Sequence, residues 1–164
     1  MKEIFTRASI RKFQNRPVED EKITELLRAA MAAPSAGNQQ PWEFYVVRNP
    51  ETIKALSGVS PYSGCAASAN VVIVSVYREK LWAPVYAHVD MSIAMENLWL
   101  ACESQGLGGV WLGIAPEEAR MQAVEKILAL PEGLRAFAVF PLGYPAEQRE
   151  RPDRFDADRI HYIE

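Results

Sequence analysis

The segment 7–11, with the sequence Arg-Ala-Ser-Ile-Arg, carries side chains that could hold an anion. Two guanidinium groups bracket a hydroxyl, and guanidinium groups bind phosphate through charge-assisted hydrogen bonds. More arginines stand near the end of the sequence, at Arg149, Arg151, Arg154 and Arg159. Both groups could close on one phosphate dianion. The alternative in each place is a solvated basic surface, because arginines and runs of charge are usually exposed to water.

A loop at residues 33–42, Ala-Pro-Ser-Ala-Gly-Asn-Gln-Gln-Pro-Trp, is the second candidate for ligand contact. Its two prolines restrict the backbone, while Ser35, Asn38 and Gln40 offer hydrogen-bond donors and acceptors. A rigid polar loop of this kind suits a bound ligand. Ordinary turn chemistry explains the same composition, because Ser, Gly, Asn and Pro are the usual residues of loops.

Several common site types are excluded by the motifs. The glycines at 106–109, with Gly113, follow a predicted helix and open a predicted strand, which is the reverse of a dinucleotide-binding fingerprint. Gly106 is instead expected to end the helix. The motifs of phosphate-loop nucleotide hydrolases, zinc proteases and serine hydrolases are missing from the sequence. Two cysteines and two distant histidines argue against a structural zinc site, so no metal is expected.

Length and composition point to an ordinary globular protein. The chain has 164 residues, of which 49% are hydrophobic and 24% charged. One domain over residues 1–164 is expected, because a chain of this length buries roughly 70% of the surface that it exposes when unfolded. The net charge of −3 gives no indication of a basic surface that would bind nucleic acid. No apolar run reaches membrane-spanning length and no signal peptide is recognisable, so a cytoplasmic protein without a membrane partner is expected.

Periodicity predicts alternating helices and strands. Helices are expected at 18–32, 85–104 and 116–130, with a short one starting at 50–52. Strands are expected at 42–47, 71–77, 109–114 and 134–142, the last interrupted by Pro141, and a further short strand at 159–163. This alternation indicates an α/β or α+β protein with a mixed sheet.

The predicted helix at 85–104 is apolar on nearly all of its faces. A helix of this kind is buried in a core or an interface, and a single core of this size leaves one of its sides to be covered. We therefore expect part of it to pack against the same helix of a second subunit. A charge within it, as in Met95→Lys, is expected to break the dimer.

Taken together and in order, these segments resemble the nitroreductase family of flavoproteins, in its shorter-chain branch. The shared motifs are R-x-S-x-R-x-F at 7–13, A-P-S-x-x-N-x-Q-P-W at 33–42, G-L-G-x-x-W-L-G at 106–113, and G-Y-P at 143–145 before an arginine-rich tail. The resemblance covers nearly the whole chain. It implies an α+β, three-layer fold with a mixed, mainly antiparallel central sheet flanked by helices. It also implies a homodimer with FMN at the interface, in which the tail at about 144–164 embraces the partner subunit.

The resemblance further assigns cofactor-binding residues. Arg7, Ala8, Ser9 and Arg11, with Arg149 or Arg151, match the contacts to the phosphate and ribityl chain. Pro34, Ser35, Ala36 and Asn38 match the loop that reaches a flavin, with Pro34 and Ser35 serving the flavin of the partner subunit. Trp111, Leu112 and Gly113 match the segment that presents backbone N–H groups to the flavin N5 edge.

The chemistry implied is that of the flavin, so no catalytic side chain is expected. Hydride from NADH or NADPH would pass through flavin N5 to a small electrophilic acceptor, such as a nitroaromatic or a quinone, by a ping-pong mechanism. Two alternatives stay open. One is an FMN-binding protein with little turnover, and the other is an enzyme of the same fold with different flavin chemistry, such as dehalogenation or flavin fragmentation.

The sequence also departs from the family pattern. Larger relatives have an excursion that helps to cover the active site, where this chain has only residues 78–83. Trp82 and Tyr86 are candidates to cover the substrate face, with packing at a helix start as the alternative. Gly113 stands where many relatives have an acidic residue, so any specificity set by that side chain is absent.

Overall fold

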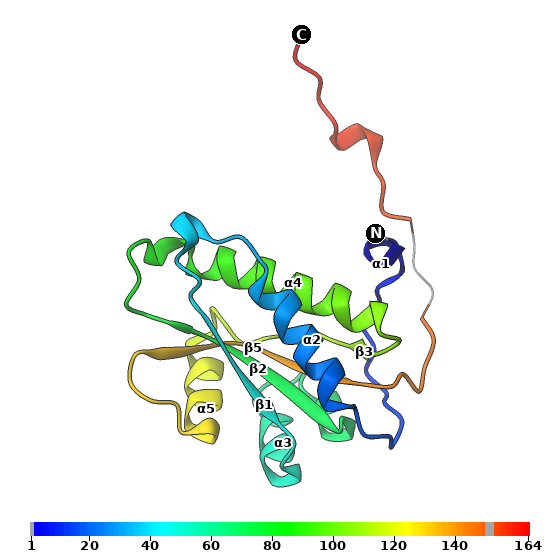
Figure 1. Ribbon diagram of the computed structural model, residues 1–164, viewed down its shortest axis with the longest axis vertical. Helices are drawn as coiled ribbons and strands as arrows, with labels where there is room; N and C mark the ends of the chain where they lie inside the picture. Colours follow the sequence, from blue (N-terminus) through cyan, green and yellow to red (C-terminus); the bar gives the residue numbers. More distant parts are fainter. Residues whose placement is uncertain (1, 150–152) are drawn as a thin grey trace.

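A central antiparallel sheet organises the chain. The computed structural model describes residues 2–149 and 153–164. The strand order is β1 (Trp42–Val47), β2 (Val71–Arg78), β5 (Leu134–Gly143) and β3 (Gly108–Gly109), and β4 (Leu112–Gly113) also pairs with β5 (Figure 1). All of these pairs are antiparallel. An isolated parallel bridge between Ser9 and Gly109 makes the sheet mixed.

Strand β2 shows why the sheet lies in the middle. Val71 and Ile73 belong to one buried cluster, whereas Val72, Val74 and Val76 belong to another. Successive side chains of a strand point to opposite faces, so both faces of β2 are covered. This double burial explains its nearly uninterrupted β-branched composition.

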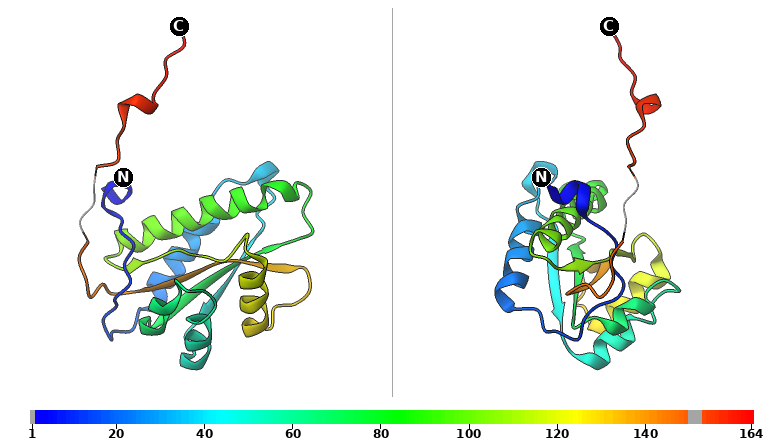
Figure 2. Two further views of the ribbon diagram at one scale, coloured as in Figure 1. Left: turned by 180° about the vertical axis from the view of Figure 1, so that it is seen from behind. Right: turned by 90° about the vertical axis from the view of Figure 1, so that its right-hand side faces the viewer.

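Helices cover the two faces of the sheet. On one face lie α2 (Asp20–Met31) and α4 (Ala87–Ser104), and on the other lie α3 (Pro50–Leu56) and α5 (Glu118–Leu128) (Figures 1 and 2). The short helix α1 (Lys2–Thr6), which the sequence analysis did not predict, packs on α4. The predicted α+β, three-layer architecture is confirmed. Among the described residues, no helix is long and apolar enough to cross a bilayer.

Short 3-10 helices complete the connections. They are η1 (Ala36–Asn38), η2 (Gly64–Ser68), η3 (Pro84–Tyr86) and η4 (Ala157–Arg159). Because η3 precedes α4, the helix predicted from residue 85 begins as α-helix only at Ala87. Gly106 follows α4 with a φ of 70°, in the left-handed conformation expected of a residue that ends a helix.

Two strand predictions were wrong. The strand expected at 109–114 is divided into β3 and β4, because the register places Val110 opposite Pro141, which has no N–H to donate. Pro141 therefore interrupts the neighbouring ladder, while β5 itself continues to Gly143. The strand expected at 159–163 is absent, since this part of the tail holds η4 and irregular backbone that extends away from the layers (Figure 1).

Met95 is not a suitable position at which to test the predicted dimer. Met95 is fully buried in the core of its own subunit, so a lysine there would disrupt that core before it tested a dimer. The exposed apolar residues of this region are Val85, Val89 and Ile93, which are 79%, 54% and 37% exposed. Val89 and Ile93 are four residues apart and lie on one side of α4, and Val85 stands four residues before Val89, in η3; we call these three residues the α4 stripe.

Candidate functional site

The segment 7–11 lies along the edge of the sheet. The Ile10 N–H donates to the carbonyl of Gly109 at 3.0 Å, next to the bridge between Ser9 and Gly109. A Cβ atom at Gly108 would lie 2.7 Å from the Ile10 side chain, so this close approach requires glycine. The segment 7–11 therefore lies along β3, and β4 follows β3 on the same side of β5.

The two arginines of this segment have different surroundings. The Arg7 guanidinium lies 3.9 Å from the ring centre of Trp99, and its Nε is 3.4 Å from a Glu96 carboxylate oxygen. Arg7 is therefore anchored on α4. Arg11 is exposed, and its guanidinium donates to the Ser9 carbonyl at 3.3 Å without a carboxylate partner among the described residues. Arg11 has the more available charge for a ligand.

The first residues of the tail, 145–149, lie beside the segment that begins at residue 7. Pro145 bridges to Phe13, and the Ala146 N–H donates to the Lys12 carbonyl at 2.9 Å. Glu147 accepts a hydrogen bond from the Arg11 N–H at 2.6 Å and another from the Arg149 guanidinium at 3.3 Å. The Arg11 N–H, with Arg149 nearby, lowers the pKa of Glu147. Arg149 is thereby brought beside Arg11, whereas Arg151 lies outside the described residues.

Strand β4 forms the third side of this region. It pairs with β5 through Leu112 and Gly113, and as an edge strand it directs alternate N–H groups away from β5. Leu112 is buried and Trp111 packs against Phe137 with ring centres 5.6 Å apart. Gly113 is exposed, and a Cβ atom there would meet no other atom within 4 Å.

The loop at residues 34–40 lies elsewhere on the same subunit. It contacts the first turn of α4 through Asp90, whereas Arg7 contacts Glu96 and Trp99. Nine residues separate Asp90 from Trp99, which is about 13 Å along a helix. One subunit therefore does not bring the loop and the segment 7–11 together. A loop that contacts the cofactor of the partner subunit would be separated from the segment 7–11 of its own subunit in this way.

The loop at residues 34–40 has side-chain hydrogen-bond donors that could bind a ligand. The Ser35 Oγ accepts a hydrogen bond from the Gln40 N–H at 2.9 Å, and the Asn38 Oδ1 accepts one from Gln40 Nε2 at 2.9 Å. In the part of the chain that the structure describes, the Ser35 hydroxyl hydrogen and the Asn38 amide group have no acceptor of their own. Pro34 is exposed and Ala36 is half-buried beside them.

Trp82 and Tyr86 lie near this loop. Trp82 is 71% exposed, and its ring lies so close to Gly37 that a Cβ atom there would overlap it. Tyr86 is 52% exposed at the end of η3. Trp82 therefore packs on the loop rather than only on the helix start, while its role toward a substrate stays a prediction.

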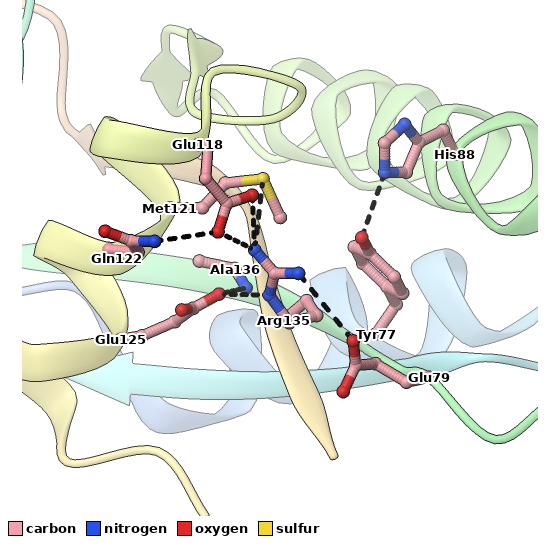
Figure 3. Close-up of polar contacts among 9 residues, drawn as sticks. All are labelled: Tyr77, Glu79, His88, Glu118, Met121, Gln122, Glu125, Arg135 and Ala136. Atoms are coloured by element: carbon pink, nitrogen blue, oxygen red, sulfur yellow. Dashed lines mark hydrogen bonds and ion pairs between the residues drawn. The ribbon is translucent and has the colours of Figure 1, made fainter. Parts of the chain in front are cut away.

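A polar cluster connects the start of β5 with α5, on the face of the sheet away from α2 and α4 (Figure 3). Arg135 donates to Glu118 at 2.7 Å and to Glu125 at 2.8 Å, and it lies 3.7 Å from Glu79. These contacts tie β5 to α5 and to the end of β2. Nearby, His88 Nε2 lies 3.1 Å from the Tyr77 hydroxyl, and burial lowers the pKa of His88.

This cluster predicts a pH dependence of stability. The hydrogen bond from Arg135, with one from Gln122, lowers the pKa of Glu118 in the folded state. Its stabilising effect is thus fully present above the unfolded pKa of about 4.3 and is lost as the pH falls through the folded pKa. We expect Glu118→Gln to lower the free energy of unfolding at pH 7 and to differ less from the wild type as the pH falls from 5 to 3.

Urea unfolding across this pH range measures the effect. Glu132→Gln is the matched control, because Glu132 is exposed, whereas the ion pairs of Arg135 among the described residues are with Glu79, Glu118 and Glu125. An equal deficit for Glu118→Gln at pH 7 and pH 3 would show that charge pairing with Arg135 is not what stabilises the fold.

Comparison with known proteins identifies the family of the chain. The family model described as "Nitroreductase family" matches residues 4–61 and 61–144. A protein of Methanothermobacter thermautotrophicus, provisionally named an NADH dehydrogenase/NAD(P)H nitroreductase, is 44% identical over 159 residues, which cover 96% of this chain and 83% of the relative. The chain belongs to the nitroreductase family.

Solved structures agree with the family. The crystal structure of a provisionally named NADH oxidase from Clostridium acetobutylicum has a TM-score of 0.95 and 42% identity, and the match covers 99% of both chains. A provisionally named nitroreductase from Desulfovibrio desulfuricans, solved in complex with FMN, has a TM-score of 0.86 and 28% identity over 99% of this chain and 95% of that one.

The family also contains other chemistries. An iodotyrosine deiodinase from Haliscomenobacter hydrossis is 27% identical over 179 residues, with 90% of this chain and 79% of the relative covered. Membership of the nitroreductase family therefore does not by itself decide which acceptor is reduced.

Two residues of this region were missed by the sequence analysis. Asp90 is 2% exposed in α4 and accepts a hydrogen bond from the loop at Ala36, and Gln39, which belongs to the loop, donates another to Asp90. The available signal was a carboxylate, one of three with Glu96 and Glu103, in a largely apolar helical segment. Such a residue rarely lies in a core unless it is paired.

Proposed function

We propose that this nitroreductase-family chain is an FMN-dependent NAD(P)H oxidoreductase that reduces small electrophilic acceptors such as nitroaromatics or quinones. The observation that carries the proposal is the gathering of Arg11 and Arg149 beside Ser9, which bridges to Gly109 of β3, close in sequence to the edge strand β4. Cations and a hydroxyl suit the phosphate and ribityl chain of FMN, and backbone N–H groups suit the edge of its ring. The FMN complex of the Desulfovibrio desulfuricans relative supports the same choice of cofactor.

In this proposal the cofactor site is shared by two subunits. Arg7, Ala8, Ser9, Arg11 and Arg149 of one subunit hold the phosphate and ribityl chain, and Arg151 is a further candidate. Trp111, Leu112 and Gly113 of the same subunit lie at the ring edge. Pro34, Ser35, Ala36 and Asn38 come from the partner, which agrees with their distance from Arg7 within one chain.

The proposed homodimer would also cover apolar surface. The α4 stripe is exposed, and so are Ile4 and Phe5 of α1, which packs on the same helix. The tail at 153–164 adds exposed apolar side chains of its own: Phe155, Ile160, Tyr162 and Ile163. A second subunit that receives this tail would remove all three surfaces from water.

The chain's own residues would bind and orient the cofactor. When bound, FMN supplies hydride transfer between a nicotinamide and the acceptor. The arginines fix the phosphate, the backbone of β4 fixes the ring edge, and Trp82 and Tyr86 border the face where nicotinamide and acceptor stack. No acid, base or nucleophile of the protein is required, in keeping with the lack of such a constellation in the sequence.

Dehalogenation and other flavin chemistry form the second candidate function, favoured by the deiodinase among the relatives. A flavin-binding protein with little turnover would use the same contacts. Turnover with NADH or NADPH and a quinone, compared with turnover on halogenated and nitro compounds, separates these functions.

The test of the proposed function begins with the purified protein. We expect a yellow protein whose released cofactor has the mass of FMN, because the proposed site holds a single phosphate and the sequence lacks the dinucleotide fingerprint. Steady-state oxidation of NADH or NADPH should give parallel double-reciprocal lines, since nicotinamide and acceptor share one face. FAD in place of FMN, or a colourless protein that takes up no FMN, would overturn the assignment. Intersecting lines would instead indicate a separate acceptor site.

A further inference from the structure

Asp90 is a buried carboxylate whose two oxygens are both bound by the loop at 34–40. Its Oδ1 accepts a hydrogen bond from the Ala36 N–H at 2.9 Å, and its Oδ2 accepts one from Gln39 Nε2 at 2.7 Å. The residue is only 2% exposed. A buried charge is unfavourable unless its partners are well placed, and apolar replacements of similar size are often tolerated. A carboxylate in this buried position, with both oxygens bound by the loop, therefore points to a task in holding the loop.

The loop needs holding because its backbone is strained. Gly37, Asn38 and Gln40 have φ values of 51°, 57° and 45°, in the left-handed region. Non-glycine residues enter this region at a cost, and such conformations persist when the surrounding structure fixes them. Asp90 fixes the first part of the loop. The Arg78 guanidinium, which donates to the Gln40 carbonyl, fixes its end.

Gln39 extends the network to the segment that carries Trp82. Its Oε1 accepts from the Ala83 N–H at 3.2 Å, and its Nε2 donates to the Ala83 carbonyl at 3.1 Å. Its carboxamide is therefore bound on one side by Asp90 and on the other by both backbone groups of Ala83. Trp82, the neighbour of Ala83, lies on Gly37 of the same loop.

We propose that Asp90 is a positioning residue that holds the strained loop in the conformation that contacts the flavin ring and, through Gln39, places Trp82 at the acceptor side. The inference rests on the proposed function, because it requires the loop to meet a flavin. Asp90 itself touches neither cofactor nor substrate. Its effect on binding must therefore pass through the loop, at the ring end of the cofactor and away from the phosphate.

The binding test compares FMN with riboflavin, which lacks the phosphate. Asp90→Asn keeps the shape of the side chain but replaces one of its two acceptor oxygens by an NH2 group, so that the donors of Ala36 and Gln39 are left with one acceptor between them. We expect fluorescence titration to show both flavins weakened by about the same factor, roughly tenfold or more. The ratio of the two dissociation constants should stay at its wild-type value, because the phosphate contacts are intact. Glu21→Gln, the same change at an exposed position of α2, is the control and should leave both constants unchanged.

A second measurement does not depend on flavin. Amide hydrogen exchange in the purified protein should be faster at Ala36 in Asp90→Asn and faster at Ala83 in Gln39→Met. The double variant Asp90→Asn with Gln39→Glu exchanges the carboxylate and the amide between the two positions. The amide at position 90 can then donate to the carboxylate at position 39, and the pair still holds one carboxylate. We expect this double variant to recover protection at Ala36 and part of the lost flavin affinity, which general damage to the fold would not allow.

The outcomes separate the two proposals. A wild-type protein that binds neither flavin overturns the proposed function, whatever the exchange data show. If the wild type binds FMN, unchanged affinity in both Asp90→Asn and Gln39→Met overturns the positioning role. A selective loss of FMN with riboflavin unaffected would also overturn it, since that pattern belongs to the phosphate site. Should Asp90→Asn fail to fold, Gln39→Met alone decides the question by the same comparison.

Discussion

Val89→Lys should leave a folded subunit that is monomeric and has lost most of its affinity for FMN. Val89 lies in the middle of the α4 stripe and is 54% exposed, so a lysine there meets water in the isolated subunit. In the proposed dimer the same ammonium group would be buried opposite its own copy. An unpaired buried charge costs several kcal/mol, which weakens a dimer more than a hundredfold.

The loss of FMN follows from the shared site. If the loop at 34–40 serves the partner's cofactor, a monomer retains only the contacts of the segment 7–11, β4 and Arg149. Sedimentation followed at a flavin wavelength and at 280 nm measures both properties in one experiment. Val46→Lys is the matched control, because Val46 is 40% exposed on β1, away from α4.

Two results would contradict this prediction. A folded monomer that keeps stoichiometric FMN at native affinity would refute the shared site, although membership of the nitroreductase family would stand. A Val89→Lys protein that remains dimeric would show that the subunits meet through another surface.

Arg11→Ala should weaken FMN by roughly tenfold to a hundredfold, because a charge-assisted hydrogen bond to phosphate contributes about 1.5–3 kcal/mol. Arg11 is chosen over Arg7 because Arg7 also packs on Trp99 and pairs with Glu96, so its removal would disturb α4. Riboflavin affinity should be unaffected by Arg11→Ala. The loss for FMN should also shrink as the salt concentration rises, since the contact is exposed to solvent.

Titration of both flavins at two salt concentrations tests this prediction. Arg28→Ala removes an exposed arginine of α2 and is the control for net charge. Unchanged FMN affinity in Arg11→Ala would mean that Arg11 is only a solvated surface residue, as the alternative interpretation of the sequence holds.

Local patterns were sufficient to predict much of the fold. Strand β1 has the bounds expected from Trp-Glu-Phe-Tyr-Val-Val, and β2 differs by one residue, because β-branched runs bounded by turn residues are strong signals. The long apolar helix was also found, but its faces were not. Met95 and Val89 are both apolar, and only the packing of α2 and the sheet shows that the first is inside and the second outside.

The candidate site was predictable where its residues are close in sequence. The segment 7–11 and the loop at 33–42 were recognisable from composition and motif. Asp90 and Gln39 were not, because their significance lies in a contact across 51 residues that no local pattern encodes. The difference between an anchored Arg7 and an exposed Arg11 likewise depends on Trp99 and Glu96, which approach only in the folded chain.

The open space beside Gly113 has a consequence for engineering. A Cβ atom added there would meet no other atom of the subunit within 4 Å, and the position has an ordinary backbone conformation. Substitutions at Gly113 would therefore be nearly free of packing effects. If Gly113 lies at the flavin edge, as proposed, a small library at this one codon would test its effect on acceptor preference with little of the loss of stability that usually limits such redesign.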